Sequence, residues 1–165
     1  MRAASVYTQS NGLRVVLVPD DRSPAAAFYL WVKVGSADEQ PKEAGLAHVL
    51  EHMLFKGTPT RGVGAVAQEI EGCGGDINAY TSFDNTVYHA VLASRFFDTG
   101  LDVVVDAVTR SVIDANELTL EKEVILEEIK RDGDQPTRRV SHALFDAAYR
   151  VHPYGRPVIG TRELV

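Results

Sequence analysis

The sequence predicts an α+β fold, a two-layer sandwich in which a mostly antiparallel mixed sheet carries helices on one face. Segments with an apolar residue at every second position dominate the early part of the chain, and long segments with helical periodicity follow. Strands first and helices later are typical of α+β folds. At 165 residues, the chain is long enough to form one domain with its own hydrophobic core.

A β-hairpin is predicted at the start of the chain. Residues 6–8 and 13–18 are strand-like and flank Asn11-Gly12, the dipeptide most typical of a tight hairpin turn. Residues 26–34 form the next predicted strand, because large apolar side chains alternate there with more polar ones. The alternation indicates that this strand buries one face only.

The middle of the chain predicts two helices followed by two strands. Apolar residues recur at helical spacing over residues 43–55, and Gly57 comes directly after that segment. A second helix is predicted over residues 63–71 and ends at a run of glycines. Strands over residues 77–81 and 86–92 follow, joined by a polar turn.

Three more helices are predicted in the second half. One begins at about Ser94 and carries an apolar stripe, and another covers residues 116–131. Gly133 and Pro136 are expected to separate it from a third helix over residues 140–150.

The last residues look like the start of a further element. Residues 161–165 resemble a helix N-cap and its first turn. The chain shows neither an internal repeat nor a low-complexity tract that would divide it. We therefore expect residues 1–165 to be a single N-terminal domain that belongs to a longer chain.

Composition excludes several classes of function. The 23 acidic and 17 basic residues give a net charge of −6, which argues against a nucleic-acid surface. Cys73 is the single cysteine, so no intrachain disulfide can form. No segment reaches membrane-spanning length, so we expect no membrane partner, and no apolar signal-like run follows the first residues. These features predict a cytoplasmic location, with the periplasm or an organelle as the alternative.

A metal-site motif lies inside the helix predicted over residues 43–55. His48 and His52 are four residues apart, which places both imidazoles on one side of the helix. Glu51 lies on the same flank, where it can take a proton from a metal-bound water as a general base. Catalytic zinc usually has three protein ligands, so a third must come from elsewhere. The alternative is a pair of surface histidines on an amphipathic helix.

The third ligand is predicted on the helix over residues 116–131. Glu121 and Glu128 lie seven residues apart and share a stripe with the apolar Ile125. Two carboxylates on a partly apolar face need compensation, which zinc bound by Glu128 with Glu121 beside it would provide. Glu127 is the competing ligand, although it points away from this stripe. The alternative is a solvated helix face whose acids pair with neighbouring lysines and arginines.

Several separated motifs resemble the pitrilysin and insulysin family of zinc peptidases, which includes the mitochondrial processing peptidase and its bacterial relatives. They are residues 10–15, the run from 45 through 58 with His-x-x-Glu-His, and residues 121–128. In this family, that motif inverts the thermolysin order. The similarity covers nearly the whole chain and resembles the family's N-terminal, catalytic half.

The resemblance implies roles for the same residues. His48, His52 and Glu128 would bind one Zn²⁺ ion, Glu51 would be the catalytic base, and Glu121 would be an auxiliary acidic residue near the metal. The implied reaction is hydrolysis of peptide bonds in peptides or unfolded segments.

The resemblance also implies how substrate is bound and what else is needed. Residues 77–82 are similar to the family's strand beside the metal, to which an extended peptide adds, so Asn78 and Ala79 would contact substrate. Without the resemblance, Asn78 would be interpreted as satisfying a local turn. A second homologous half or subunit, such as a second copy of this chain, would complete the enzyme. The alternative function is a noncatalytic subunit that binds or presents peptides.

Overall fold

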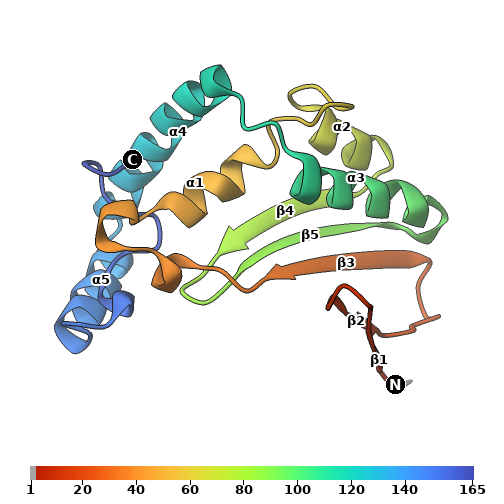
Figure 1. The fold of residues 1–165 in the computed structure, drawn as a ribbon, viewed down its shortest axis with the longest axis horizontal. Helices are drawn as coiled ribbons and strands as arrows, with labels where there is room; N and C mark the ends of the chain where they lie inside the picture. The colour runs from red at the N-terminus through yellow and green to blue at the C-terminus, as the bar shows by residue number, and fades with distance from the viewer. Residues whose placement is uncertain (1–2) are drawn as a thin grey trace.

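A three-stranded antiparallel sheet forms the base of the computed structural model, which describes residues 3–165 (Figure 1). Its strands are β3 (Ala25–Val32), β4 (Asp76–Thr81) and β5 (Thr86–Ala93), in the order β3-β5-β4. The central strand β5 pairs with both neighbours, and β4 therefore lies at an edge of the sheet. The strands predicted over residues 26–34, 77–81 and 86–92 are thus confirmed.

The predicted opening hairpin is also confirmed. It consists of β1 (Ser5–Thr8) and β2 (Arg14–Leu17), which form a separate two-stranded sheet. Gly12 adopts φ of +87°, a left-handed conformation that glycine enters without steric cost. The side chain of Asn11 accepts a hydrogen bond from Leu13 N at 3.0 Å, which closes the turn.

Helices cover one face of the three-stranded sheet, as Figure 1 shows. They are α1 (Leu46–Met53), α2 (Ala65–Gly72) and α3 (Phe97–Arg110), with short 3₁₀ turns between some of the elements. Helix α4 (Ala115–Asp134) packs against α1, and α5 (Pro136–Ala148) packs against α4, so these two helices lie away from the strands. The α+β class is therefore confirmed, and the strand pairs of the described residues are all antiparallel. The prediction of one N-terminal domain of a longer chain stays a prediction.

The core lies between the sheet and the helices α2 and α3. Val66 and Ile70 from α2 and Val103 from α3 are fully buried, and they pack against Ala90 and Leu92 of β5. The apolar periodicities of these helices and of β5 therefore converge on one layer. This core supports the sheet on which α1 rests.

The loop after α1 is fastened to α3 by a buried ionic cluster. Asp106 of α3 accepts hydrogen bonds from Thr58 Oγ1 at 2.7 Å and from Arg61 Nη1 at 2.6 Å. A buried carboxylate is tolerated when donors and an opposite charge satisfy it. Beside it, Ser111 Oγ donates to Met53 O, the last residue of α1, at 3.2 Å. These contacts fix the C-terminal end of α1.

Several helix boundaries differ from the predictions, among them the helix predicted over residues 140–150, which covers Pro136–Ala148. The helix predicted to begin at residue 43 begins at Leu46, because Gly45 has φ of +102° and cannot be part of a right-handed helix. The helix predicted to end at 131 continues through Gly133, since one glycine costs a helix only about 1 kcal/mol. Gln135 alone then separates α4 from α5, and Pro136 takes the first position of α5, where proline is favourable.

The last residues form a hydrogen-bonded turn. Leu164 N and Val165 N both donate to Thr161 O, so the predicted helix N-cap and first turn correspond to a turn without a helix assignment. Among the described residues, no helix is long and apolar enough to cross a membrane.

Candidate metal centre

Helix α1 presents two histidines to the same point in space. The ring centroids of His48 and His52 are 4.6 Å apart, as expected for residues one helical turn apart. The Glu39 carboxylate accepts hydrogen bonds from Gly45 N at 2.9 Å and from Ala47 N at 2.6 Å. It thereby satisfies amide donors at the N-terminal end of α1 and complements the positive end of the helix dipole.

Glu128 from α4 completes a three-residue cluster. Its Oε2 lies 3.4 Å from His52 Nε2 and 3.8 Å from His48 Nε2. One potential ligand atom from each residue lies within 4.8 Å of the others. Two ligands of a tetrahedral zinc ion are about 3.3 Å apart, given zinc–ligand bonds of about 2.0–2.2 Å. The nitrogen and oxygen donors therefore fit a zinc ion in both type and spacing.

The state of the histidines suits metal binding. Burial, together with the nearby His52, lowers the pKa of His48 from 6.5 to about 4, so this imidazole is neutral at pH 7. His48 Nδ1 is buried without a hydrogen-bond partner among the described residues. Neutral imidazole is the form that binds metal, because the ligand nitrogen must carry a lone pair.

Glu121 holds His52 from the side away from Glu128. Glu121 Oε1 lies 2.8 Å from His52 Nδ1, and since a carboxylate only accepts, Nδ1 carries the proton. His52 Nε2 then keeps its lone pair facing Glu128. Burial alone would raise the pKa of Glu121, but hydrogen bonds from Lys56 and His52 outweigh it and keep that pKa below its usual value. Glu121 therefore acts through His52 and lies outside the three-residue cluster.

Glu51 is oriented by the edge strand β4. Thr81 Oγ1 donates a hydrogen bond to Glu51 Oε2 at 2.5 Å. Burial raises the pKa of Glu51, and the Thr81 hydrogen bond offsets part of that rise. A carboxylate whose pKa is shifted toward neutrality is suited to accept a proton and later release it.

The structure distinguishes Glu128 from its competitor Glu127. The Glu128 side chain is 28% exposed and faces the histidines, and its Oε1 accepts a hydrogen bond from Arg131 Nη2 at 3.1 Å. The Glu127 side chain is 76% exposed and lies 3.6 Å from Lys130. Glu127 therefore points to solvent, as the stripe pattern predicted.

The two predicted substrate-binding residues lie in the middle of β4. Asn78 is exposed, and its Oδ1 accepts a hydrogen bond from Ala79 N at 2.8 Å. This contact is local, but Asn78 lies within β4 and not at the turn that the alternative interpretation assumed. Within the described sheet β4 pairs only with β5, so the backbone groups on its outer edge are available to pair with another strand.

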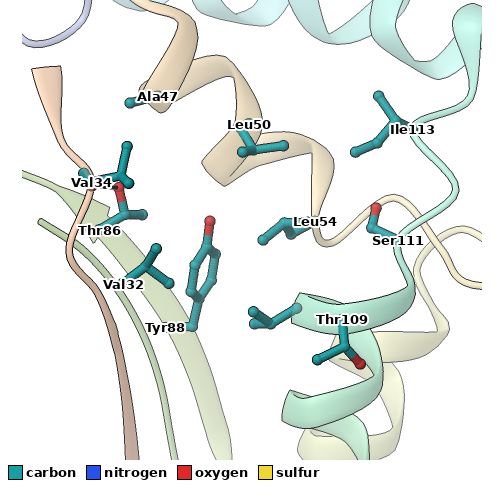
Figure 2. Close-up of a pocket in the computed structure, with 11 residues that line it drawn as sticks. Val32, Val34, Ala47, Leu50, Leu54, Thr86, Tyr88, Thr109, Ser111 and Ile113 are labelled. Carbon is teal, nitrogen blue, oxygen red and sulfur yellow. Dashed lines mark hydrogen bonds between the residues drawn. The ribbon is translucent and has the colours of Figure 1, made fainter. Parts of the chain in front are cut away.

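Two hollows adjoin α1, and they differ in character. A hollow of about 360 Å³ includes His48 and Thr81 and continues toward α5, where Arg138 and His142 line it. An apolar pocket of about 280 Å³ lies on the other side, between α1, the sheet and the end of α3 (Figure 2). Tyr88 points its hydroxyl into that pocket. Of the two hollows, the first borders the candidate metal cluster, because His48 is among its lining residues.

Two contacts of the site are not predicted from the sequence, from Thr81 to Glu51 and from Lys56 to Glu121. Thr81 was part of a strand segment whose side chains could not be assigned to partners. Lys56 lies four residues after His52, so the 48, 52, 56 spacing continues the histidine side of the helix just beyond its end. That spacing indicates Lys56, whereas the resemblance of residues 77–82 to the strand beside the metal places Thr81 near the site without indicating a hydrogen bond to Glu51.

The family model for insulinase, peptidase family M16, matches residues 14–162, which is most of the chain. The chain belongs to this family. The expected resemblance to the insulysin group is thus confirmed.

Relatives of this M16 chain are named as zinc proteases. It is 40% identical over 157 residues to YmxG of Bacillus subtilis, an uncharacterized zinc protease, covering 95% of this chain and 38% of YmxG. It is 36% identical over 160 residues to a probable mitochondrial-processing peptidase subunit beta of Arabidopsis thaliana, covering 97% of this chain and 30% of that protein.

A solved structure agrees with the fold. The crystal structure of a protease from Helicobacter pylori superposes with a TM-score of 0.93 at 30% identity, covering 98% of this chain and 39% of that one. The chain thus spans less than two fifths of the length of these relatives.

Proposed function

We propose that the chain is the zinc-binding catalytic part of an endopeptidase that hydrolyses peptides or unfolded polypeptide segments. His48, His52 and Glu128 bind the metal, and Glu51 is the general base. The observation that supports this most is the convergence of three ligand atoms from α1 and α4 within 4.8 Å, beside a carboxylate held by Thr81. Three protein ligands leave one position for water or substrate, as in catalytic zinc sites.

Each side chain then has a defined task. Bound zinc supplies a Lewis acid that polarises the scissile carbonyl and acidifies a water molecule. Glu51 accepts the proton of that water through Oε1, while Oε2 stays fixed by Thr81. The same carboxyl group then delivers the proton to the leaving amine. Glu121 keeps His52 in the tautomer that presents Nε2. Hydrolysis by an activated water requires no covalent intermediate.

The substrate is proposed to lie along β4. An extended peptide that pairs with the outer edge of this strand receives main-chain hydrogen bonds regardless of its sequence. Asn78 and Ala79 lie at the centre of that edge, and Thr81 at its end contacts Glu51. For Ala79 N to bind a peptide, Asn78 Oδ1 would have to release it, which is a small side-chain rotation. Pairing of this kind suits unfolded segments and not folded proteins.

The enzyme is proposed to need a second homologous half or subunit, of which a second copy of this chain is one form. The chain covers 38% of YmxG, so the activity of the whole protein stays a proposal. The competing function is a noncatalytic, peptide-presenting subunit. The presence of the ligand set and of Glu51 together favours the catalytic function, because a presenting subunit needs neither.

Zinc content and peptide hydrolysis, measured together on the complete protein with any partner half, test the proposal. The variants are Glu51→Gln, Glu128→Gln and Glu127→Gln. The last is a matched control one residue away on the same helix. We expect Glu51→Gln to keep its zinc and lose cleavage of an unstructured fluorogenic peptide. Glu128→Gln should bind zinc poorly, and Glu127→Gln should behave as wild type.

The opposite pattern would refute the assignment. Wild-type protein that takes up no zinc would leave the peptide-presenting function as the better explanation. Zinc loss in Glu127→Gln but not in Glu128→Gln would place the third ligand one residue earlier. Full activity of Glu51→Gln would exclude it as the base.

A further inference from the structure

Lys56 forms a second contact to the carboxylate that holds His52. It follows the end of α1, with Lys56 N bonded to Met53 O at 3.0 Å. Its ammonium group contacts Glu121 Oε2, while Glu121 Oε1 lies 2.8 Å from His52 Nδ1. One carboxylate therefore bridges a histidine of α1 and a lysine three residues after the end of that helix.

The bridge is almost buried. The side chain of Glu121 is 8% exposed and that of Lys56 is 27% exposed. A carboxylate removed from water needs partners for both oxygens, and an ammonium ion is a strong one. With each oxygen assigned to a different partner, the carboxyl group of Glu121 has one favourable orientation. Without Lys56, Oε2 would lose its partner, and the group could rotate away from His52.

The orientation of Glu121 determines that of the imidazole. His52 Nε2 faces Glu128 Oε2 at 3.4 Å only while its Nδ1 is held from behind. Groups that hydrogen-bond a ligating histidine fix its tautomer and ring plane, and their loss usually weakens metal binding. The end of α1 that precedes Lys56 is itself tied to the rest of the fold, through the hydrogen bond from Ser111 Oγ to Met53 O.

We propose that Lys56 is a positioning residue of the metal site, which acts through Glu121 to hold His52 ready for zinc. The inference rests on the proposed function, since it assumes that His48, His52 and Glu128 bind zinc. The alternative is that the ion pair between Lys56 and Glu121 only helps to hold α4 in place. A structural role would change stability, whereas a positioning role changes metal affinity and depends on the carboxylate of Glu121.

The dissociation constant for Zn²⁺, measured by competition with a chromophoric chelator, provides the test. Lys56→Met keeps most of the side-chain length and removes the charge, Lys56→Arg keeps the charge, and Glu121→Gln removes the bridging carboxylate. Lys130→Met is the control, because Lys130 is 63% exposed and pairs with the solvent-facing Glu127. Absorption spectra of Co²⁺-loaded protein report the ligand geometry independently of activity.

We expect Lys56→Met to weaken Zn²⁺ binding by about tenfold or more, within the 10- to 100-fold range typical of groups that orient metal ligands. The Co²⁺ spectrum should change with it. Lys56→Arg should restore most of the affinity, and Lys130→Met should bind as wild type. In a Glu121→Gln background, Lys56→Met should weaken binding no further, because the group through which Lys56 acts is already gone.

Two results would overturn the inference while leaving the proposed function intact. One is wild-type Zn²⁺ affinity in Lys56→Met. The other is an equal loss in the Glu121→Gln background, which would indicate general loosening of the fold. Thermal midpoints of all variants identify such loosening, and Lys56→Gln replaces Lys56→Met if the latter does not fold. Wild-type protein without Zn²⁺ affinity would refute the proposed function, and this inference with it.

Discussion

The hydrogen bond from Thr81 to Glu51 leads to a quantitative prediction for Thr81→Val. Valine preserves the β-branched shape of threonine and its preference for strands, and it removes only the hydroxyl. Thr86, which also approaches Thr81 at 3.5 Å, keeps Val34 O as its acceptor at 3.0 Å, so the change leaves no other polar group unsatisfied. The effect should therefore reach Glu51 alone.

The size of the effect follows from the bond that is lost. A hydrogen bond to a charged group contributes about 1.5–3 kcal/mol. If that energy serves to orient the base in the transition state, kcat falls by roughly 10- to 150-fold. Zinc content should not change, because among the described residues the Thr81 side chain hydrogen-bonds Glu51 and Thr86 and none of the three proposed ligands.

The pH profile should change in a defined direction. Burial already raises the pKa of Glu51, and Thr81 counteracts that rise. A base works in its ionised form, so activity is present above its pKa and is lost as the pH falls through it. Removing the Thr81 donor raises the pKa further, and the acid limb of kcat should move to higher pH.

Peptide hydrolysis across a range of pH, with zinc quantified in the same samples, checks both expectations. Thr119→Val is the matched control, since Thr119 donates only to Ala115 O within α4. A Thr81→Val protein with wild-type kcat and an unmoved acid limb would refute the role of this bond. A loss of zinc would instead mean that Thr81 supports the metal ligands.

Three further changes test how the site and the fold are stabilised. Metal-free protein should lose up to about 3 kcal/mol of unfolding free energy as the pH falls from 6.5 to 4, because His48 takes up a proton more readily in the unfolded chain than in the folded one. Urea titrations at several pH values measure this loss, and an unfolding free energy that does not change with pH would contradict it. Ile125→Ala, at a fully buried position of α4, should cost about 2–5 kcal/mol, whereas Val124→Ala at a 48% exposed neighbour should cost much less. Gly100→Ala should lower the thermal midpoint, because the added Cβ would lie 2.7 Å from the side chain of the buried Leu92. Gly133→Ala should raise the midpoint, because nothing lies within 4 Å of the added Cβ and alanine favours a helix more than glycine does. Equal shifts in both variants would refute the close packing at Gly100.

Much of the fold and the metal cluster could be predicted from local spacing. His48 and His52 share a side of α1 because four residues make about one turn, and Glu121 and Glu128 share a face of α4 because seven residues make about two. Each relation is fixed within one helix. The same periodicity excluded Glu127, whose side chain is indeed exposed.

The contacts between elements could not be predicted. Thr81 and Glu51 are 30 residues apart and lie on a strand and a helix, whose relative placement depends on the packed core. The bridge from Lys56 to Glu121 likewise joins the segment after α1 to α4. The end of α4 was placed too early for another reason: Gly133 and Pro136 were both interpreted as breakers, but proline is compatible with the first turn of α5.

The proposed metal site and the docking of α4 should stabilise each other. Helix α4 contacts α1 through the carboxylates of Glu121 and Glu128, and Ile125 between them in the sequence is fully buried. Leu120 and Val124 on its other side are exposed, so apolar burial alone holds this helix weakly. A zinc ion shared by the two helices adds a cross-link that exists only while α4 is docked.

A ligand that binds only the docked form stabilises it by about 2.7 kcal/mol at a concentration one hundred times its dissociation constant. Zinc should therefore slow amide hydrogen exchange in α1 and α4 and leave α2 unchanged, because α2 packs in the core against α3 and β5. Uniform slowing across all three helices would mean that they open together. In that case the metal would stabilise the whole fold, and α4 would not be a separately docking element.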